Sequence, residues 1–384
     1  MNSESTIHGN VAPGFERVKE EFAAVAAAEG GSLSAQLAAY HNGKLVVDLW
    51  TGPEIQGDSL LGAYSASKGA GALIVALLTQ ERILNLEEKV SHYWPEFAVN
   101  GKAHITLREL MSHRAGLVGS DEGFTIEQLA DDRYVAARLG AQRPYWQPGS
   151  AFGYHALVMG ALENEVVYRA TGKTVQEIFS ERVRIPYNID FYLGLTEALD
   201  SRYLHSRPHI STPERVALLA ARATAPDSIT GVAFNRHHPQ NPAVWELTNL
   251  DIVRRSGTVS FGGVASARGL AKMYAVSITS VDNKAPLLNP ETVSSFSQIQ
   301  SIGHDVVLKD FKAFAVGFHA TSEYYPSLGQ GAFGHSGAGG QQAFADPRNG
   351  LAYGYTRRQF PFPNAQAPEN DHLVKALYAA IGLC

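Results

Sequence analysis

A serine and a lysine three residues apart, Ser65 and Lys68, are the pair in this sequence best suited to do chemistry. If both lie in the first turn of a helix, their side chains share one face and reach each other. A serine hydroxyl becomes a nucleophile when a base removes its proton, and a lysine can be that base when burial and the positive end of a helix dipole lower its pKa. The same helix end presents free backbone N–H groups that can stabilise an oxyanion. The pair predicts a nucleophile at Ser65 with Lys68 as its proton-transfer partner.

The tetrapeptide Ser-x-x-Lys has low specificity on its own, because a chain with this many serines contains about one by chance. In the alternative interpretation, Ser65 caps a helix and Lys68 lies in solvent. The following residues favour the catalytic interpretation. Residues 69–75 read Gly-Ala-Gly-Ala-Leu-Ile-Val, so a helix here is small and apolar around its whole circumference. Such a helix is typically buried. Because lysine is rarely buried, a lysine at the start of this helix indicates a functional role.

The elements that must position this pair follow from periodicity. The nucleophile's helix is predicted over about 65–83, after a hairpin whose two strands, 33–40 and 44–50, meet at the turn His41-Asn42-Gly43. Two further strands are predicted near the end of the chain at 341–345 and 351–355, and a closing helix follows at 372–383. Other helical patterns lie at 15–29, 106–113, 126–139, 156–171, 174–183 and 213–223. Residues 226–250, rich in Pro, Asn and His, predict a long surface loop, and Gly262-Gly263 predicts a close backbone approach before a helix over 264–277.

Strands therefore cluster at the two ends of the chain, with helices between them. This arrangement predicts an α/β (α+β) fold in which both termini build one domain and a helical domain is inserted. The expected boundaries are 1–75 for the N-terminal part of the α/β domain, 76–262 for the mostly helical domain and 263–384 for the C-terminal part.

Composition limits the partners that we expect. The chain has 384 residues, 45% of them hydrophobic, and a net charge of −5, so it can bury a large core and has no basic footprint for nucleic acid. Its most apolar run, 70–78, is far shorter than the ~20 residues that span a bilayer. The single cysteine, Cys384, cannot form an internal disulfide, and residues 1–5 lack the start of a secretory signal. We expect a cytoplasmic protein without nucleic-acid or membrane partners, and the oligomeric state stays open.

Four segments in order resemble those of class C β-lactamase-like proteins. Residues 106–117 (TLRELMSHRAGL) resemble the family's LLTHTSGL segment, and 147–156 (QPGSAFGYHA) resemble its PGxxFxYSN segment. Residues 333–340 (FGHSGAGG) resemble its Lys-Thr-Gly or His-x-Gly strand, and 47–52 (VDLWTG) resemble the strand before the nucleophile in the esterase branch. The chain is similar to the serine β-lactamase and penicillin-binding-protein superfamily, and within it to the family VIII carboxylesterases. The resemblance implies the β-lactamase/transpeptidase-like fold, a mixed antiparallel sheet flanked by helices with an inserted helical domain.

Carried over by motif, the resemblance implies that Ser65 is the nucleophile, Lys68 its proton partner, and Tyr154 the general base or acid facing the leaving group. A phenol titrates near 10, so Tyr154 acts as a base only if a neighbouring positive charge such as Lys68 stabilises the phenolate.

The third motif is implied to form the opposite wall of the site. His335 and Gly337 would line that wall, and the backbone N–H groups of Ser65 and Ala338 would form the oxyanion hole. Ser336 is a poor rival nucleophile, because the spacing around it does not match a nucleophile elbow. The neighbouring histidines His237-His238 lack a metal-ligand spacing and are expected to be exposed, so neither a metal nor an organic cofactor is expected.

Two departures from the family pattern bear on the substrate. Relatives that hydrolyse β-lactams usually have an asparagine where this chain has Ala156, and a lysine where it has His335. Esters need neither group, so the predicted function is a serine carboxylesterase (EC 3.1.1) that hydrolyses short acyl esters of small molecules. A β-lactamase or D-amino-acid peptidase, or an acyltransferase, of the same fold is the alternative. A non-catalytic binding or sensor protein would not need to keep Ser65, Lys68 and Tyr154.

Overall fold

The computed structural model describes residues 6–30, 32–363 and 365–382. Its main element is a nine-stranded sheet with the order β1-β3-β2-β12-β11-β10-β9-β8-β7, in which neighbouring strands are antiparallel. The strands are β1 (His8–Val11), β2 (Ala35–His41), β3 (Lys44–Thr51), β7 (Ser301–His304), β8 (Phe311–Phe314), β9 (His319–Ala320), β10 (Phe333–Ser336), β11 (Gln342–Asp346) and β12 (Leu351–Arg357). The N-terminal strands join the C-terminal ones where β2 pairs with β12, which confirms that both ends of the chain build one sheet.

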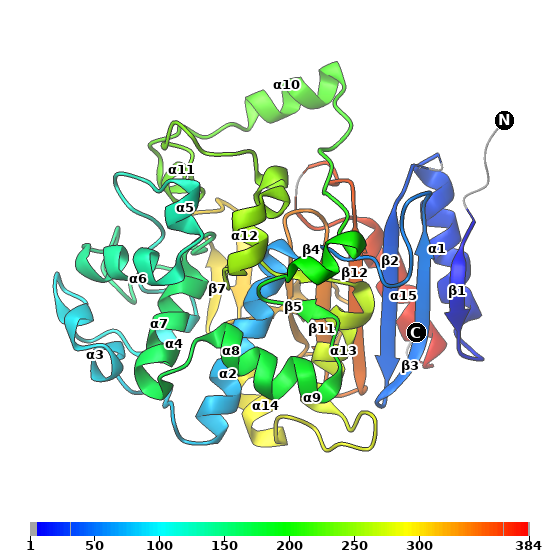
Figure 1. Cartoon of the computed structure of the whole chain (residues 1–384), viewed down its shortest axis with the longest axis horizontal. Coiled ribbons are helices and arrows are strands. Elements are labelled where there is room, and N and C mark those ends of the chain that lie inside the picture. The colour runs from blue at the N-terminus through cyan, green and yellow to red at the C-terminus, as the bar shows by residue number, and fades with distance from the viewer. Residues whose placement is uncertain (1–5, 31, 364, 383–384) are drawn as a thin grey trace.

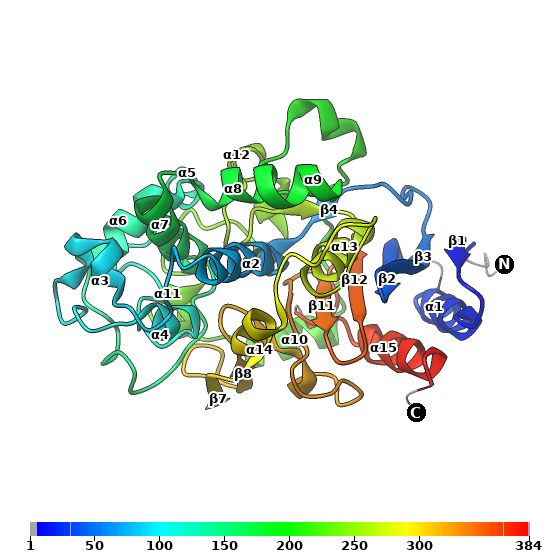
Figure 2. The ribbon, with the colours of Figure 1, turned by 90° about the horizontal axis from the view of Figure 1, so that it is seen from below.

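The predicted hairpin is present as β2 and β3. Its turn residues Asn42 and Gly43 have φ values of 49° and 76°, the left-handed backbone that a tight hairpin turn requires. Helices α1 (Glu16–Ala28) and α15 (Glu369–Ala380) pack together on one face of this part of the sheet, and α13 (Ala267–Ile278) covers the other face (Figure 2).

Most of the remaining helices gather on the side of the sheet away from β1, around α2, while α10 (Pro213–Ala221) stands apart at the top of the view (Figure 1). Helix α2 (Ser67–Gln80) is buried from Ser67 to Leu78, as the apolar pattern predicted, and packs against α7, α8, α14 and β10. Besides α2, the helices between the two parts of the sheet are α3 (Val90–Tyr93), α4 (Leu107–Met111), α5 (Ile126–Leu129), α6 (Asp132–Ala141), α7 (Met159–Thr171), α8 (Val175–Phe179), α9 (Ile185–Tyr187), α10 (Pro213–Ala221), α11 (Ile229–Ala233), α12 (Asp251–Ser256) and α14 (Pro290–Ser297). A small sheet of β4 (Leu61–Gly62), β6 (Val264–Ala265) and β5 (Phe191–Tyr192) lies where the chain enters α2.

Two expectations about the helical region were wrong in detail. The single helix predicted over 126–139 is two helices, because the Asp131 side chain accepts hydrogen bonds from the N–H groups of Arg133 and Tyr134 and starts α6 anew. Residues 226–250 are not simply a surface loop: they contain α11 and a 3₁₀ turn over Val244–Asn249. Their apolar side chains, among them the buried Ala233, pack into the protein instead of facing solvent.

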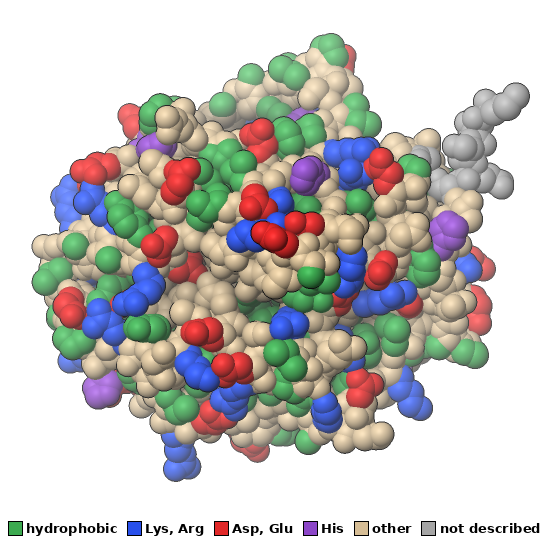
Figure 3. Space-filling view, in the orientation of Figure 1, with side chains coloured by type: hydrophobic (Ala, Val, Ile, Leu, Met, Phe, Trp, Pro, Cys, Tyr) green, Lys and Arg blue, Asp and Glu red, His purple; other side chains and the backbone are tan. Residues whose placement is uncertain are grey.

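The domain boundaries at 75/76 and 262/263 stay predictions, and the first of them falls inside α2. No helix in the described part of the chain is both long and apolar enough to cross a membrane. On the face shown in Figure 3, Lys and Arg side chains lie interspersed with Asp and Glu. Cys384 and residues 1–5 lie outside the described residues.

Candidate active site

Ser65 lies in a 3₁₀ turn, Tyr64–Ala66, that joins β4 to α2. The helix itself begins at Ser67, so Ser65 precedes the first α-helical turn in which we had expected it. Tyr64 has a φ of 48°, a conformation that is uncommon for a residue with a side chain. The Tyr64 hydroxyl donates to the Trp245 carbonyl at 2.8 Å, which holds this backbone in place and leaves Ser65 half-buried beside a cavity.

Two glycines let other segments pack against this turn. The Gly263 N–H donates to Ser67 Oγ at 2.9 Å, and a Cβ on Gly263 would lie only 2.5 Å from that oxygen, so the predicted close approach at Gly262-Gly263 is confirmed. A Cβ on Gly337, at the end of β10, would lie 2.5 Å from the Ala63 carbonyl oxygen. Glycine at 337 therefore allows the third motif to lie directly beside the segment that leads to Ser65.

Lys68 is buried in the first turn of α2, with 1% of its surface exposed. Its Nζ donates to Ser65 Oγ at 3.2 Å and to the carbonyl oxygens of Ala156 and Ser260 at 2.7 and 2.8 Å. Burial lowers the pKa of Lys68 to about 7, and the nearby Glu163 carboxyl opposes this shift. The interpretation of Lys68 as a solvated residue next to a capping serine is wrong, because the amine points inward and contacts Ser65.

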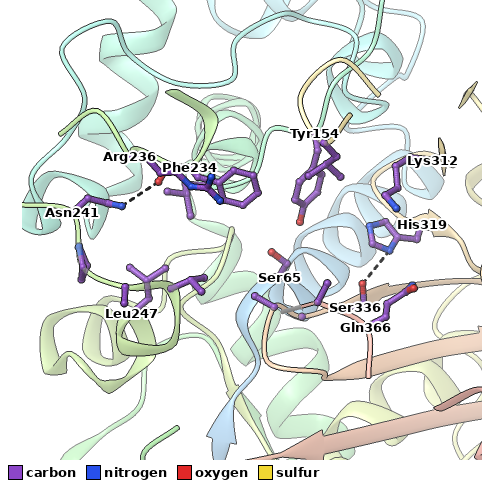
Figure 4. A pocket seen from close by; sticks show the side chains of 18 of the residues that line it. Ser65, Tyr154, Phe234, Arg236, Asn241, Leu247, Lys312, His319, Ser336 and Gln366 are labelled. Carbon is purple, nitrogen blue, oxygen red and sulfur yellow. Dashed lines mark hydrogen bonds between the residues drawn. The ribbon is translucent and has the colours of Figure 1, made fainter. Parts of the chain in front are cut away.

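Tyr154 directs its hydroxyl toward Ser65 across the cavity (Figure 4). Its backbone N–H donates to Asp305 Oδ2 at 2.9 Å, and Lys68 Nζ lies 5.0 Å from the centre of its ring. Burial raises the pKa of Tyr154 above its ordinary value, and the Ser65 hydroxyl only partly opposes this. Burial therefore favours the protonated phenol at neutral pH, and the role of Tyr154 as general base or acid stays a prediction.

The segment 106–117 positions the stretch that carries Tyr154. Arg114 donates to the Gly149 carbonyl at 2.7 Å, and the Gly153 N–H donates to the His113 carbonyl at 3.1 Å. Helix α4, which holds this segment, starts with a capping box between Thr106 and Glu109. The first two motifs of the resemblance are thus physically joined.

His335 of β10 is buried and faces the same centre. Its Nδ1 donates to the Ser336 carbonyl at 2.8 Å, while its Nε2 is buried without a hydrogen-bond partner among the described residues. The ring stacks on His319 at 3.9 Å between centroids. Burial holds the pKa of His335 well below its ordinary value, and the neighbouring His319 and Lys68 add to this effect. His335 is neutral, so it does not replace the fixed cation that a lysine would supply at this position.

Ser65 and Ala338 both line the cavity, as expected for a pair of oxyanion-hole residues. In the described part of the chain, no hydrogen bond engages the backbone N–H of either residue. Their role as an oxyanion hole stays a prediction.

The cavity has a volume of about 800 Å³ and two unlike walls, with Ser65 between them (Figure 4). One wall comes largely from 226–250 and is mainly apolar, with Leu157, Phe234, Pro239, Pro242, Val244 and Leu247, and it also carries the polar residues Arg236, His238 and Asn241. The other wall is mainly polar: Lys312, His319, Tyr324, Ser336 and Gln366. Residues 226–250, predicted as a surface loop, thus supply much of the lining of the cavity. The polar wall was missed, because Lys312, His319 and Tyr324 belong to no motif and come together only through the pairing of β8, β9 and β10.

Ser336 is the other hydroxyl in the cavity, and its Oγ lies 3.5 Å from His319 Nδ1. This contact is longer than the Lys68–Ser65 contact, so Ser336 stays the poorer candidate nucleophile. His237 and His238 are half-buried, not exposed as expected, and His237 Nε2 contacts the Ser120 carbonyl at 2.9 Å. Across residues 6–30, 32–363 and 365–382, no group of three or more His, Cys, Asp or Glu residues could hold a metal ion.

Known proteins are similar to this chain over almost its whole length. The model of the Beta-lactamase family matches residues 16–377. This chain belongs to the beta-lactamase family. It is 30% identical, over 85% of its own length and 77% of the other protein, to the esterase/beta-lactamase LipL of Mycobacterium tuberculosis. This member of the beta-lactamase family is accordingly an enzyme of the beta-lactamase fold, and the predicted resemblance and fold class are confirmed.

Solved structures agree with this assignment. The structure of EstA from Arthrobacter nitroguajacolicus Rue61a matches with a TM-score of 0.89 at 39% identity, covering 97% of this chain and 98% of that one. A family VIII carboxylesterase matches with a TM-score of 0.86 at 29% identity, covering 98% of this chain and 100% of that one. A penicillin-binding-protein homologue from Caulobacter crescentus matches with a TM-score of 0.87 at 28% identity, covering 98% of this chain and 100% of that one. A carboxylesterase and a penicillin-binding-protein homologue thus lie among the solved structures that this chain resembles.

Proposed function

We propose that this enzyme is a serine carboxylesterase of the family VIII type that hydrolyses small-molecule esters through an acyl-enzyme on Ser65. The observation that carries the proposal is the contact of 3.2 Å between Lys68 Nζ and Ser65 Oγ at the edge of the cavity. With a pKa of about 7, a substantial fraction of Lys68 is neutral at physiological pH and can accept a proton. The reaction needs no metal and no organic cofactor.

In acylation, neutral Lys68 takes the proton of Ser65 while Oγ forms a bond to the ester carbonyl carbon. The carbonyl oxygen becomes negatively charged and accepts hydrogen bonds from the N–H groups of Ser65 and Ala338. Tyr154 then gives its proton to the leaving alcohol oxygen as the carbon–oxygen bond breaks, and the Lys68 ammonium returns a proton to the phenolate. This sequence uses Tyr154 as an acid, in keeping with its raised pKa.

In deacylation, the same groups act in the reverse sense. Water enters where the alcohol left, passes a proton through Tyr154 to Lys68, and attacks the acyl carbon. The Ser65–carbon bond breaks, and Ser65 Oγ recovers a proton from the Lys68 ammonium. The products are the carboxylic acid and the restored enzyme, so the proton balance closes.

The apolar wall of the cavity supports a preference for esters that carry an apolar group. An apolar group of the substrate gains most by burial against Phe234, Val244 and Leu247, while the carbonyl-bearing centre stays at Ser65. The size of the cavity, about 800 Å³, leaves room for an acyl or alcohol group well beyond acetate. We propose that short acyl esters with one apolar group are the preferred class.

Hydrolysis of β-lactams is the second candidate, because LipL carries both activities in its name and Lys312 faces the cavity. Two features weigh against it. Ala156 has no side-chain amide to bind the substrate's amide group, and His335 is neutral. Lys312 is already paired with Asp310 at 2.8 Å, which reduces its attraction for a substrate carboxylate.

The test compares turnover of p-nitrophenyl acetate, butyrate and octanoate with that of a chromogenic cephalosporin. We expect the esters to be hydrolysed much faster than the cephalosporin, and Ser65→Ala to abolish both activities. Ser336→Ala is the matched control and is expected to keep ester turnover. Ester hydrolysis that survives Ser65→Ala, or is lost only in Ser336→Ala, would overturn the assignment of the nucleophile. Equal turnover of ester and cephalosporin would reverse the order of the two candidates.

A further inference from the structure

Tyr154 and the polar wall of the cavity lie on the same side of the active site. The ring of Tyr154 lies 5.9 Å from Phe314 of β8, 6.3 Å from His319 of β9 and 6.0 Å from His335 of β10, measured between ring centroids. The same three strands carry most of the polar wall, namely Lys312, His319 and Ser336. In the proposed mechanism the Tyr154 phenol protonates the leaving alcohol, so the alcohol part of the ester lies toward the polar wall.

The apolar wall lies on the opposite side of the cavity (Figure 4). Two of its polar side chains are already engaged within the protein. Asn235 Nδ2 donates to Asn241 Oδ1 at 3.1 Å, and Asn241 Nδ2 donates to the Phe234 carbonyl at 3.3 Å. Arg236 Nη1 donates to Thr224 Oγ1 at 3.1 Å. This wall therefore offers a substrate mainly apolar surface, which suits an acyl chain.

The polar wall keeps hydrogen-bonding capacity that the protein does not use. In the described part of the chain, the His319 ring has one hydrogen-bond contact, its Nδ1 lying 3.5 Å from Ser336 Oγ, at the outer limit of a hydrogen bond. Lys312 Nζ carries three N–H groups and pairs with one carboxylate, that of Asp310, at 2.8 Å. The Gln366 side chain lines the cavity beside them. Polar groups with spare capacity on a cavity wall indicate a site for a polar part of the substrate.

The mixture of groups on this wall favours hydroxyl groups over an anion. Burial lowers the pKa of His319 to about 3, so its neutral ring has one N–H donor and one acceptor nitrogen. The Gln366 amide also both donates and accepts. Lys312 can only donate, and the Asp310 carboxylate next to it would repel an anion. A hydroxyl group, which donates and accepts, matches these partners better than a carboxylate, which only accepts.

We propose that the polar wall is the subsite for the alcohol part of the ester, and that this alcohol is a polyol such as glycerol. The inference rests on the proposed function, because it takes Tyr154 as the acid that protonates the leaving oxygen. The free hydroxyl groups of the alcohol bind His319, Lys312 and Gln366. The acyl chain lies against the apolar wall, so each end of an amphipathic ester meets the wall that suits it.

The test compares two butyrate esters of the same shape, glycerol 1-butyrate and 2-methylbutyl butyrate. The second ester has a methyl group in place of each free hydroxyl group of the first. Release of butyric acid, followed in a pH-stat, gives kcat and KM for both esters. We expect kcat/KM to favour the glycerol ester by about tenfold, mainly through a lower KM, because its hydroxyl groups find partners on the polar wall.

Two variants remove partners of the alcohol. His319→Phe keeps a ring to stack on His335 but loses both nitrogens, and Gln366→Leu loses the amide. Each variant should lower the ratio of the two kcat/KM values by about three- to tenfold, through a higher KM for the glycerol ester. Comparing the ratio between enzymes cancels the intrinsic difference in reactivity between the esters. A ratio that stays the same in both variants would overturn the proposal.

Ser301→Ala is the matched control in the same sheet. The Ser301 hydroxyl on β7 donates to the Ser112 carbonyl at 2.8 Å and does not line the cavity. Its loss should lower the melting temperature and leave the ratio of the two esters unchanged. A change in the ratio as large as that in Gln366→Leu would show that the ratio follows general disturbance of the sheet, which contradicts the proposal.

An anionic ester, butyryloxyacetate, tests the alternative ligand for this wall. We expect it to be hydrolysed more slowly than the glycerol ester. If it is instead the preferred substrate, and Lys312→Met removes the preference, the wall binds a carboxylate and the proposal is wrong.

A separate readout distinguishes this inference from the proposed function. The leaving group of p-nitrophenyl butyrate has no free hydroxyl group, so its hydrolysis reports the chemistry at Ser65 without the alcohol subsite. If Ser65→Ala abolishes this hydrolysis but His319→Phe and Gln366→Leu leave the ratio of the other two esters unchanged, the alcohol subsite alone is refuted. If hydrolysis does not depend on Ser65, the proposed function is refuted, and the inference with it.

Discussion

The amine of Lys68 lies 3.2 Å from the hydroxyl of Ser65, and both side chains come from one turn of chain at the start of α2. Two backbone carbonyls, of Ala156 and Ser260, hold the amine in place from the other side. Because the amine is fixed, its reactivity depends on whether it carries a proton. In the proposed mechanism, burial of Lys68 therefore decides at which pH the pair can react.

The pH dependence of kcat/KM should show this directly. Burial lowers the pKa of Lys68 to about 7, and only the neutral amine can accept the proton of Ser65. Activity should be low below pH 6, rise through about 7 and reach a plateau above it. Esterase rates measured from pH 5 to 9 with p-nitrophenyl butyrate check this. A rate that falls as the pH rises through 7 would contradict the role of Lys68 as the base.

Replacement of Lys68 by Met should lower kcat by about 10²–10⁴-fold, the usual contribution of a proton-transfer group. Lys102 offers a matched control. It is also a fully buried lysine whose Nζ donates to two backbone carbonyls, those of Val99 and Gln142, but it does not line the cavity. Lys102→Met should reduce the melting temperature and leave kcat/KM nearly unchanged. Equal kinetic loss in both variants would show that general destabilisation, not proton transfer, is responsible.

Tyr154→Phe removes the phenol and keeps the ring that stacks on Phe314. We expect kcat to fall by about 10²–10⁴-fold with little change in melting temperature, because the lost group is a proton donor and the packing is retained. The loss should be smaller for esters of more acidic alcohols, which leave without protonation. Comparison of p-nitrophenyl and ethyl esters of the same acid measures this difference. The same loss for both esters would argue against Tyr154 as the acid.

Phe234→Ala opens the apolar wall of the cavity. We expect the preference for butyrate over acetate to fall by up to about tenfold, because one or two methylene groups lose part of their buried contact. Gln366→Ala, on the polar wall, is the comparison variant and should leave that ratio unchanged. Steady-state kinetics on both esters give the ratio. An unchanged ratio in Phe234→Ala would place the acyl group elsewhere in the cavity.

Gly337→Ala places a Cβ 2.5 Å from the Ala63 carbonyl oxygen and 2.5 Å from Gln341 Oε1. Because backbone must move to relieve the first contact, we expect a loss of about 1–3 kcal/mol in the free energy of unfolding, and a larger fall in kcat than stability alone explains. Gly329→Ala is the control, since the nearest atom to its added Cβ, at 2.9 Å, is the far end of the flexible Arg348 side chain and not backbone. Denaturant unfolding and esterase assays measure both quantities. Full activity in a folded Gly337→Ala enzyme would show that β10 need not approach the Ser65 turn so closely.

Local properties of this protein follow from its sequence. Asn42-Gly43 permits the left-handed turn of the β2–β3 hairpin, and the apolar residues after Lys68 specify a buried helix. The three-residue spacing of Ser65 and Lys68 predicted their contact, although Ser65 lies in a 3₁₀ turn just before α2 and not in the helix itself. The order of the motifs also pointed to Tyr154 and His335, although only by resemblance. Residues 126–139 and 226–250 were less well predicted, because a capping side chain and packing against distant residues decided their structure.

Only the tertiary structure decided what the site can do. It brings Tyr154, Ser260 and His319, which belong to distant parts of the chain, around Ser65 and Lys68. It also sets their charge: Lys68 is partly neutral and Tyr154 protonated because the fold removes both from water. Burial and electrostatic fields depend on everything that surrounds a group in space. Spacing along the chain therefore singles out Ser65 and Lys68 as candidates, while the polar wall of the cavity and the protonation states appear only when the chain is folded.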